Sequence, residues 1–107
     1  MRDRPVRHIV MWRVHGDTAA ERHQSRLKVK QAFEGLRGRI DGLRSLEAGL
    51  DVSEVDYAFD IVLVTEFDSA SHLQAYATHP DHLRVRDELI NIRIARHQVD
   101  YVVEADA

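Results

Sequence analysis

The residues best suited to acid–base chemistry stand close together, on either side of a single proline. Tyr76, His79 and His82 follow one another at steps of three around Pro80. Proline is tolerated in the first turn of a helix and disfavours helical geometry in the preceding residue, so we expect one helix to end near Thr78 and another to begin at Pro80. His82 then lies about one turn inside the second helix. The helix dipole there favours a neutral imidazole, which is the form that a general base requires.

Each of these residues also has a purely structural interpretation. Tyr76 can cover the edge of the core with its hydroxyl near water, and His79 can cap the second helix. A tie between His82 and Asp100 could simply hold that helix against the last strand. His79, His82 and Asp100 could also share a divalent metal, but the proline between the histidines argues against this. We predict neither a metal nor a cofactor.

The composition predicts one domain over residues 1–107. Its net charge of -3 gives no reason to expect a nucleic-acid partner, which would need a basic surface. The lack of cysteine excludes disulfides, thiol catalysis and cysteine-ligated metals. No apolar run reaches the roughly 18 residues of a membrane span, and the charged start lacks the apolar region of a signal peptide. We therefore expect a soluble, cytoplasmic protein without a membrane partner.

Hydrophobic periodicity predicts four strands, at residues 6–14, 43–50, 59–67 and about 94–103. Thr18 and Glu21 form a capping box that should begin a long helix after the first strand. The apolar residues expected on that helix are Val29, Ala32, Phe33, Leu36 and Ile40. The helices around Pro80 lie between the third and fourth strands, and the apolar stripe expected on the second of them contains Leu83, Leu89 and Ile90. The order β-α-β-β-α-β predicts an α+β, ferredoxin-like fold, with helices on one face of a four-stranded antiparallel sheet.

The predicted helices can cover only one face of the sheet, although the strands carry apolar residues on both. At this chain length, dimerisation would also help to bury enough apolar surface. We therefore predict a homodimer in which two sheets pack face to face about a two-fold axis. The residues expected in this interface are Ile9, Met11, Val62, Val64, Val99, Tyr101 and Val103.

Five segments resemble a known family in their order along the chain. They are R-H-I-V-M-W-R-V (7–14), L-R-S-L-E-A-G (43–49), D-I-V-L-V-T-E-F-D-S (60–69), A-Y-A-T-H-P-D-H (75–82) and V-D-Y-V-V (99–103). With them the chain resembles the stress-responsive α/β-barrel family, a group of small dimeric ferredoxin-like proteins also called Dabb domains. The resemblance implies a dimeric α/β barrel.

Members of this family that act as polyketide cyclases use a tyrosine and a histidine beside the His-Pro-x-His block as an acid–base pair. A first-strand histidine and a last-strand aspartate help to build their pocket. The resemblance implies these catalytic roles for Tyr76, His82, His8 and Asp100. Asp100 would accept a hydrogen bond from one nitrogen of His82 and leave the other nitrogen as the base. It would also raise the pKa of His82 and oppose the effect of the helix end, so the sequence does not give the sign of the net shift. Tyr76 would donate to an oxygen that gains charge in the transition state.

The wall of the pocket is expected to differ from that of the cyclases. The ligand-binding residues that we predict are Trp12, Phe33, Arg93, Arg96 and Gln98. The last three stand where cyclases have aromatic or apolar residues, so a polar or anionic ligand is expected in place of a long apolar tail. Arg93 or Arg96 would hold an anionic group such as a carboxylate through the paired donors of a guanidinium.

Two functions from different classes stay open. The first is a stress-response homodimer that binds a small ligand without catalysis. The second is a cofactor-independent lyase or cyclase that uses Tyr76 and His82 on an enolisable molecule. A cofactor-free monooxygenase is a third function, supported only by the shared fold, which does not determine activity. A pocket lined by Tyr76, His82 and Asp100 would favour the enzyme, whereas a solidly packed interior would not.

Overall fold

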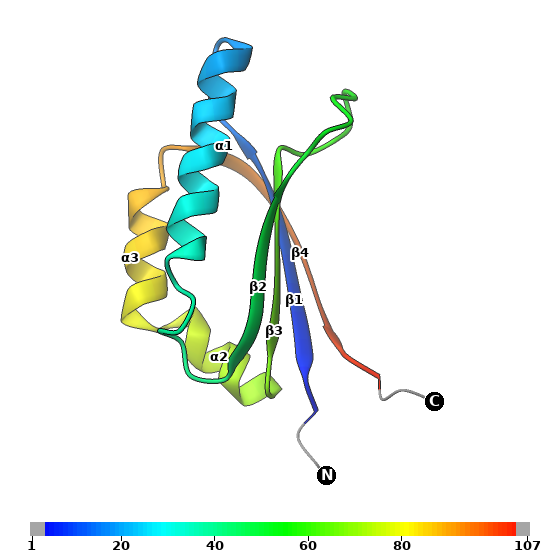
Figure 1. Ribbon diagram of the computed structural model, residues 1–107, viewed down its shortest axis with the longest axis vertical. Coiled ribbons are helices and arrows are strands. Elements are labelled where there is room, and N and C mark those ends of the chain that lie inside the picture. Colours follow the sequence, from blue (N-terminus) through cyan, green and yellow to red (C-terminus); the bar gives the residue numbers. More distant parts are fainter. Residues whose placement is uncertain (1–3, 105–107) are drawn as a thin grey trace.

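The computed structural model describes residues 4–104. Its antiparallel strands are β1 (Val6–Val14), β2 (Leu43–Leu50), β3 (Ile61–Phe67) and β4 (Arg93–Val102), in the sheet order β2-β3-β1-β4. The helices are α1 (Ala19–Glu34), α2 (Ala70–Ala77) and α3 (Pro80–Glu88), and all lie on one face of the sheet (Figure 1). The predicted ferredoxin-like fold is confirmed. Within residues 4–104, no helix combines the length and apolar character that a membrane span requires.

β1 lies in the middle of the sheet, and its alternation decides which side chains face the helices. His8, Val10 and Trp12 are buried on the helix-covered face, whereas Ile9 and Met11 belong to the opposite face. Phe33 of α1 packs on Trp12 with ring centroids 5.0 Å apart and an interplanar angle of 16°. This stack places an aromatic wall between the first strand and the first helix.

α1 begins as predicted, since Thr18 and Glu21 form the capping box. It ends at Glu34 and does not reach Ile40. Gly35 closes the helix, and Gly38 has a φ of 76°, a backbone conformation that a helix cannot continue through. Leu36 and Ile40 are nevertheless buried in the core. The apolar spacing therefore predicted the burial of both residues correctly, but the helix predicted from it was too long.

The predicted helix break around Pro80 is confirmed. α2 ends at Ala77 and α3 begins at Pro80, while the side chain of His79 caps α3 by accepting a hydrogen bond from the backbone N–H of Asp81 at 3.0 Å. The buried members of α3 and its C-cap are Val85 and Leu89. Ile90, which was expected on the same stripe, lies beyond the helix and is exposed because the chain turns there toward β4.

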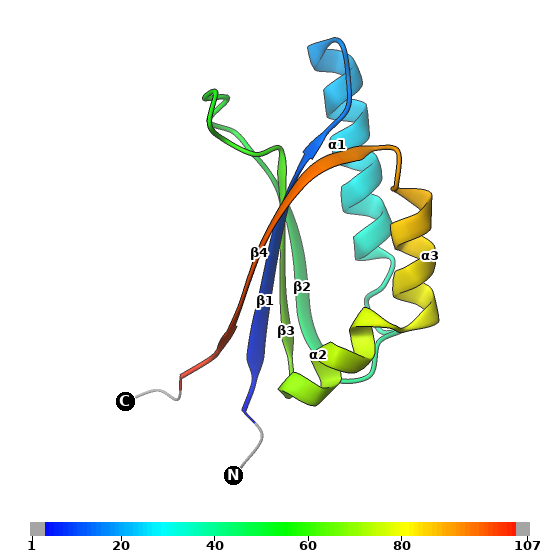
Figure 2. The same ribbon diagram turned by 180° about the vertical axis from the view of Figure 1, so that it is seen from behind.

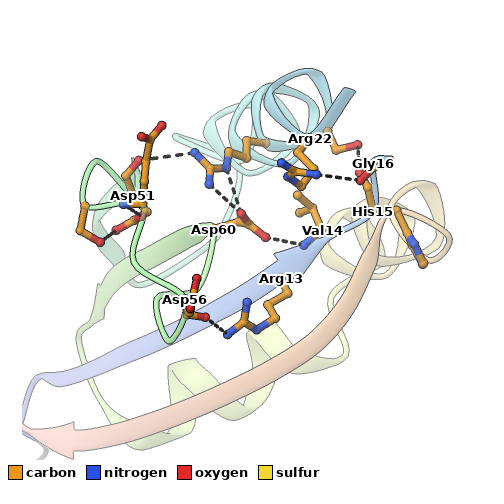
Figure 3. Close-up of polar contacts among 12 residues, drawn as sticks. Arg13, Val14, His15, Gly16, Arg22, Asp51, Asp56 and Asp60 are labelled. Carbon is orange, nitrogen blue, oxygen red and sulfur yellow. Dashed lines mark hydrogen bonds and ion pairs between the residues drawn. The ribbon is translucent and has the colours of Figure 1, made fainter. Parts of the chain in front are cut away.

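β3 begins at Ile61, two residues later than predicted, because Asp60 is used in a junction between elements. One oxygen of Asp60 accepts the backbone N–H of Val14 at 2.9 Å, and the other accepts two hydrogen bonds from Arg26 at 2.7 and 3.1 Å. Figure 3 shows Asp60 at this junction between β1 and α1. Phe59 precedes the strand and packs under the guanidinium of Arg13 at 4.7 Å. These contacts fix the end of the sheet that lies away from Pro80.

The face of the sheet without helices carries the apolar residues predicted for a dimer interface. Ile9 pairs with Val64 of β3 and with Val99 of β4, so the three side chains share this face. Val99 is 62% exposed in the single chain. Figures 1 and 2 show the helices on one side of the sheet and none on the other.

Candidate functional site

A cavity of about 570 Å³ opens on the helix-covered face, where α3 stands over β1 and β4. Its lining contains seven of the nine predicted site residues, which are His8, Trp12, Phe33, Tyr76, His82, Arg93 and Arg96. The other two, Gln98 and Asp100, line an adjoining cavity of about 510 Å³. The two cavities share His8, Tyr76, His82 and Arg96 in their walls. The region expected to hold the chemistry is therefore hollow and is not solidly packed.

Tyr76 is held on α2 with its ring in the core. Its side chain is 3% exposed, and its hydroxyl makes no hydrogen bond within residues 4–104. Burial raises the pKa of this hydroxyl above its ordinary value, with Arg93 and Arg96 opposing the rise. The group therefore stays protonated at neutral pH and is a hydrogen-bond donor without a partner, a costly condition for a buried polar atom.

The geometry of His82 assigns its tautomer. Its Nδ1 lies 3.2 Å from the backbone oxygen of Ala77, and because a carbonyl can only accept, Nδ1 carries the hydrogen. The lone pair of neutral His82 is then on Nε2. Burial lowers the pKa of His82, and Arg86, His8 and Arg93 lower it further, while the hydrogen bond to Ala77 opposes this; the net lowering favours the neutral ring. The ring centroids of His82 and Tyr76 are 4.3 Å apart.

The predicted hydrogen bond between His82 and Asp100 is wrong. Asp100 lies directly opposite His8 in the pairing of β1 with β4, and its Oδ1 is 2.5 Å from Nδ1 of His8. Its other oxygen accepts a hydrogen bond from Gln98 at 2.8 Å. Both carboxylate oxygens are thus used within the sheet, whereas His82 on α3 finds its partner in the preceding helix. Asp100 orients His8 and does not orient His82.

An irregularity in β4 brings two arginines to the same face of the sheet. Arg96 pairs with Trp12, whereas Arg93 pairs with Val14 because a register shift leaves Ile94 as an additional residue. A bulge of this kind re-aims the following side chains, so Arg93 and Arg96 both line the cavity despite an odd spacing. The guanidinium of Arg93 lies over the ring of Trp12, 5.1 Å from its centroid. Strict alternation along the strand would have placed the two arginines on opposite faces.

Sequence reasoning missed Arg86, which lines the mouth of the cavity together with Ile90 and Ile94. A signal was available, because Arg86 follows His82 by four residues and therefore lies on the same face of α3. Within residues 4–104, no group of three or more histidine, aspartate or glutamate side chains is placed to share a metal ion. The alternative metal site of His79, His82 and Asp100 is therefore not formed.

The family follows from comparison with known proteins. A sequence model of the Stress responsive A/B Barrel Domain family, abbreviated Dabb, matches residues 6–103. The chain belongs to this family. It is the family that the five segments of the sequence resemble. The matched range includes each of the nine residues predicted for the site.

This Dabb domain is similar to two proteins of unknown function and, in its fold, to a lyase. A dimeric protein of unknown function from Bacteroides fragilis is 31% identical, with a TM-score of 0.81 over 92% of this chain and 96% of that one. An uncharacterized protein of Streptomyces coelicolor is 29% identical over 77 residues, 72% of this chain and 78% of its own length. A hydroxynitrile lyase from Passiflora edulis is 14% identical, with a TM-score of 0.79 over 99% of both chains. At that identity the likeness shows the fold alone.

Proposed function

We propose that this Dabb domain binds a small carbonyl compound and moves a proton at the carbon next to its carbonyl group, as a cofactor-independent lyase or cyclase does. One observation carries the proposal. A buried, protonated Tyr76 hydroxyl, which has no hydrogen-bond partner among residues 4–104, lies beside a neutral His82 in the wall of one cavity. A donor and a base placed next to each other are the two groups that enolisation needs.

The roles follow from the hydrogen positions. Nε2 of His82 removes the proton from carbon, while the hydrogen on Nδ1 stays on that nitrogen and is donated to the carbonyl oxygen of Ala77, which holds the ring in place. Tyr76 donates to the carbonyl oxygen of the ligand as that oxygen gains negative charge. The His82 imidazolium then returns the proton to carbon, or to a leaving group. His8, oriented by Asp100, forms the wall beside Tyr76, with ring centroids 6.1 Å apart.

Binding without turnover is the second candidate, and one observation favours it. The Tyr76 hydroxyl is covered by neighbouring atoms, so a ligand oxygen reaches it only after a side-chain adjustment. A domain that only binds its ligand does not require contact with this hydroxyl, so it would not need that adjustment. The monooxygenase alternative still rests on the fold, and no contact in the cavity favours it.

An exchange experiment separates these two functions. The protein is incubated in D₂O with a panel of small 2-oxo and 3-oxo acids, and loss of the proton next to the carbonyl is followed by NMR. We expect exchange faster than in buffer, reduced roughly 10²–10⁴-fold in His82→Gln. Binding seen as a thermal shift without exchange would leave only the binding function. If no compound exchanges or raises the melting temperature, both functions should be abandoned.

The domain is also proposed to act as a homodimer through the face of the sheet without helices. Support comes from the apolar row that includes Ile9, Val64 and Val99 and from the dimeric Bacteroides fragilis relative. Because the cavity lies on the opposite face, a partner sheet would leave its mouth open. The cytoplasmic location expected from the sequence stays a prediction.

A further inference from the structure

The charged side chains that residues 4–104 contribute to the lining of the cavity of about 570 Å³ are all of one sign. Arg86, Arg93 and Arg96 belong to its lining, and no aspartate or glutamate of residues 4–104 does. None of the three forms an ion pair with a carboxylate of residues 4–104. Three arginines without counter-charges in one concave wall concentrate positive potential and attract anions.

The inner wall adds a second donor without a partner. Trp12 is 3% exposed, and its indole Nε1 makes no hydrogen bond within the described chain. The guanidinium of Arg93 lies over the same indole, and its own hydrogen bond, to the backbone oxygen of Arg86, is long at 3.4 Å. A buried indole N–H normally finds an acceptor, so its lack of one here points to an acceptor that residues 4–104 do not supply.

We propose that Trp12 and Arg93 form the carboxylate-binding part of this cavity and therefore select its ligand. This inference rests on the proposed function and names its substrate class: a small planar carboxylate with a second oxygen, such as a 2-oxo, 3-oxo or 2-hydroxyaryl acid. One carboxylate oxygen accepts from the indole N–H and the other from the guanidinium. The oxo or hydroxyl oxygen of the ligand, outside its carboxylate, accepts a hydrogen bond from the Tyr76 hydroxyl. The two buried donors, Trp12 Nε1 and the Tyr76 hydroxyl, then each have a partner.

The shape and position of these groups favour a carboxylate over a phosphate. The Trp12–Phe33 stack forms a flat aromatic wall, which suits a planar group. Arg93 is half-buried beside that wall, whereas Arg86 and Arg96 are exposed at its rim. One guanidinium and one indole N–H together provide donors for the two oxygens of a carboxylate, and a phosphate would leave further charge without partners beside the aromatic wall.

Trp12 is the only tryptophan of the chain, so its indole gives a single N–H signal in a ¹⁵N–¹H correlation spectrum. The probe is 2-hydroxybenzoate, and its neutral amide, 2-hydroxybenzamide, is the control for charge. We expect 2-hydroxybenzoate to move the indole signal downfield and to bind at least about tenfold more tightly than the amide, as calorimetry would measure. Inorganic phosphate is added in competition and should not displace it.

The variants Trp12→Phe, which keeps the aromatic wall, and Arg93→Met, which keeps the aliphatic stem, should each weaken binding about tenfold or more. Arg84→Met is the matched control, because Arg84 lies on the same helix as Arg86 but outside the lining. Circular dichroism checks the fold of each variant. If Trp12→Phe does not fold, Arg93→Met and the indole shift of the unchanged protein decide the question.

Three results would overturn the inference: equal affinity for acid and amide, an indole signal that does not move, or displacement by phosphate. Its failure is distinguishable from failure of the proposed chemistry. Proton exchange that is insensitive to Trp12→Phe and Arg93→Met would remove the carboxylate site and keep the catalyst. Binding of 2-hydroxybenzoate as expected, with no exchange of any oxo acid, would keep the site and remove the catalyst.

Discussion

Replacing Tyr76 with phenylalanine should make the ligand-free protein more stable while weakening its chemistry. The Tyr76 side chain is 3% exposed, and its hydroxyl has no partner in the described chain. A buried polar group without a partner costs about 1–3 kcal/mol, and the small void left by the oxygen offsets part of the gain. We therefore expect the free energy of unfolding to rise by about 1 kcal/mol. Proton exchange should slow by roughly 10²-fold or more, the usual effect of removing one donor to an oxyanion.

Urea denaturation followed by circular dichroism measures the stability change, at one protein concentration because dimerisation contributes. Tyr57→Phe is the matched control, since Tyr57 is 84% exposed and the same substitution there should change stability by less than about 0.5 kcal/mol. A loss of about 1 kcal/mol or more in Tyr76→Phe would show that the hydroxyl already has a hydrogen-bond partner. That outcome would refute the argument that the ligand provides it.

The remaining predictions concern charge, assembly and pH. Asp60→Ala should cost about 3 kcal/mol in urea denaturation, the low end for breaking a buried pair, because it leaves Arg26 and a backbone N–H of β1 without their acceptor. Asp56→Ala, which removes an exposed carboxylate, should change little, and an equal loss in both would contradict this account. Val64→Lys should give a monomer in light scattering, since it puts an unpaired charge in the proposed interface; an unchanged dimer would exclude that face. Burial lowers the pKa of His82 below its ordinary 6.5. As the pH falls through 6.5, His82 therefore binds a proton in the unfolded chain before it does so in the folded protein, and the unchanged protein loses stability. The stability of His82→Gln should fall less steeply with pH. Parallel pH profiles of stability would contradict a buried, neutral His82.

The parts of the site that depend on local rules could be predicted from the sequence. Proline is tolerated in the first turn of a helix and disfavours helical geometry in the residue before it, whatever the rest of the fold. The positions of Tyr76, His79 and His82 around the break at Pro80 could therefore be predicted. The capping box at Thr18 is equally local. Apolar spacing is a weaker rule, because it predicts burial without showing that the chain is helical. Ile40 is buried but lies outside α1.

The partner of Asp100 could not be predicted, because it depends on the register of β1 against β4. Alternation places His8 and Asp100 on the helix-covered face, but it does not say which residue lies opposite which. The two are 92 positions apart in the chain. The bulge at Ile94 is likewise invisible in the periodicity, although it decides that Arg93 and Arg96 share the cavity. The lack of partners for the two buried donors, seen within residues 4–104, is a property of the packed structure and has no signal in the sequence.

Alternate residues of β1 face the ligand cavity and the surface proposed for the dimer. Trp12 belongs to the ligand cavity, while Met11, next to it in the chain, belongs to the face proposed for the dimer. A slip of one residue would exchange them, so the register of β1 fixes both functions at once. The buried donors of Trp12 and Tyr76 reduce the stability of a small domain whose total is itself only about 5–15 kcal/mol. Apolar burial on the opposite face can offset that cost without filling the cavity, which gives assembly a direct physical role in maintaining the site.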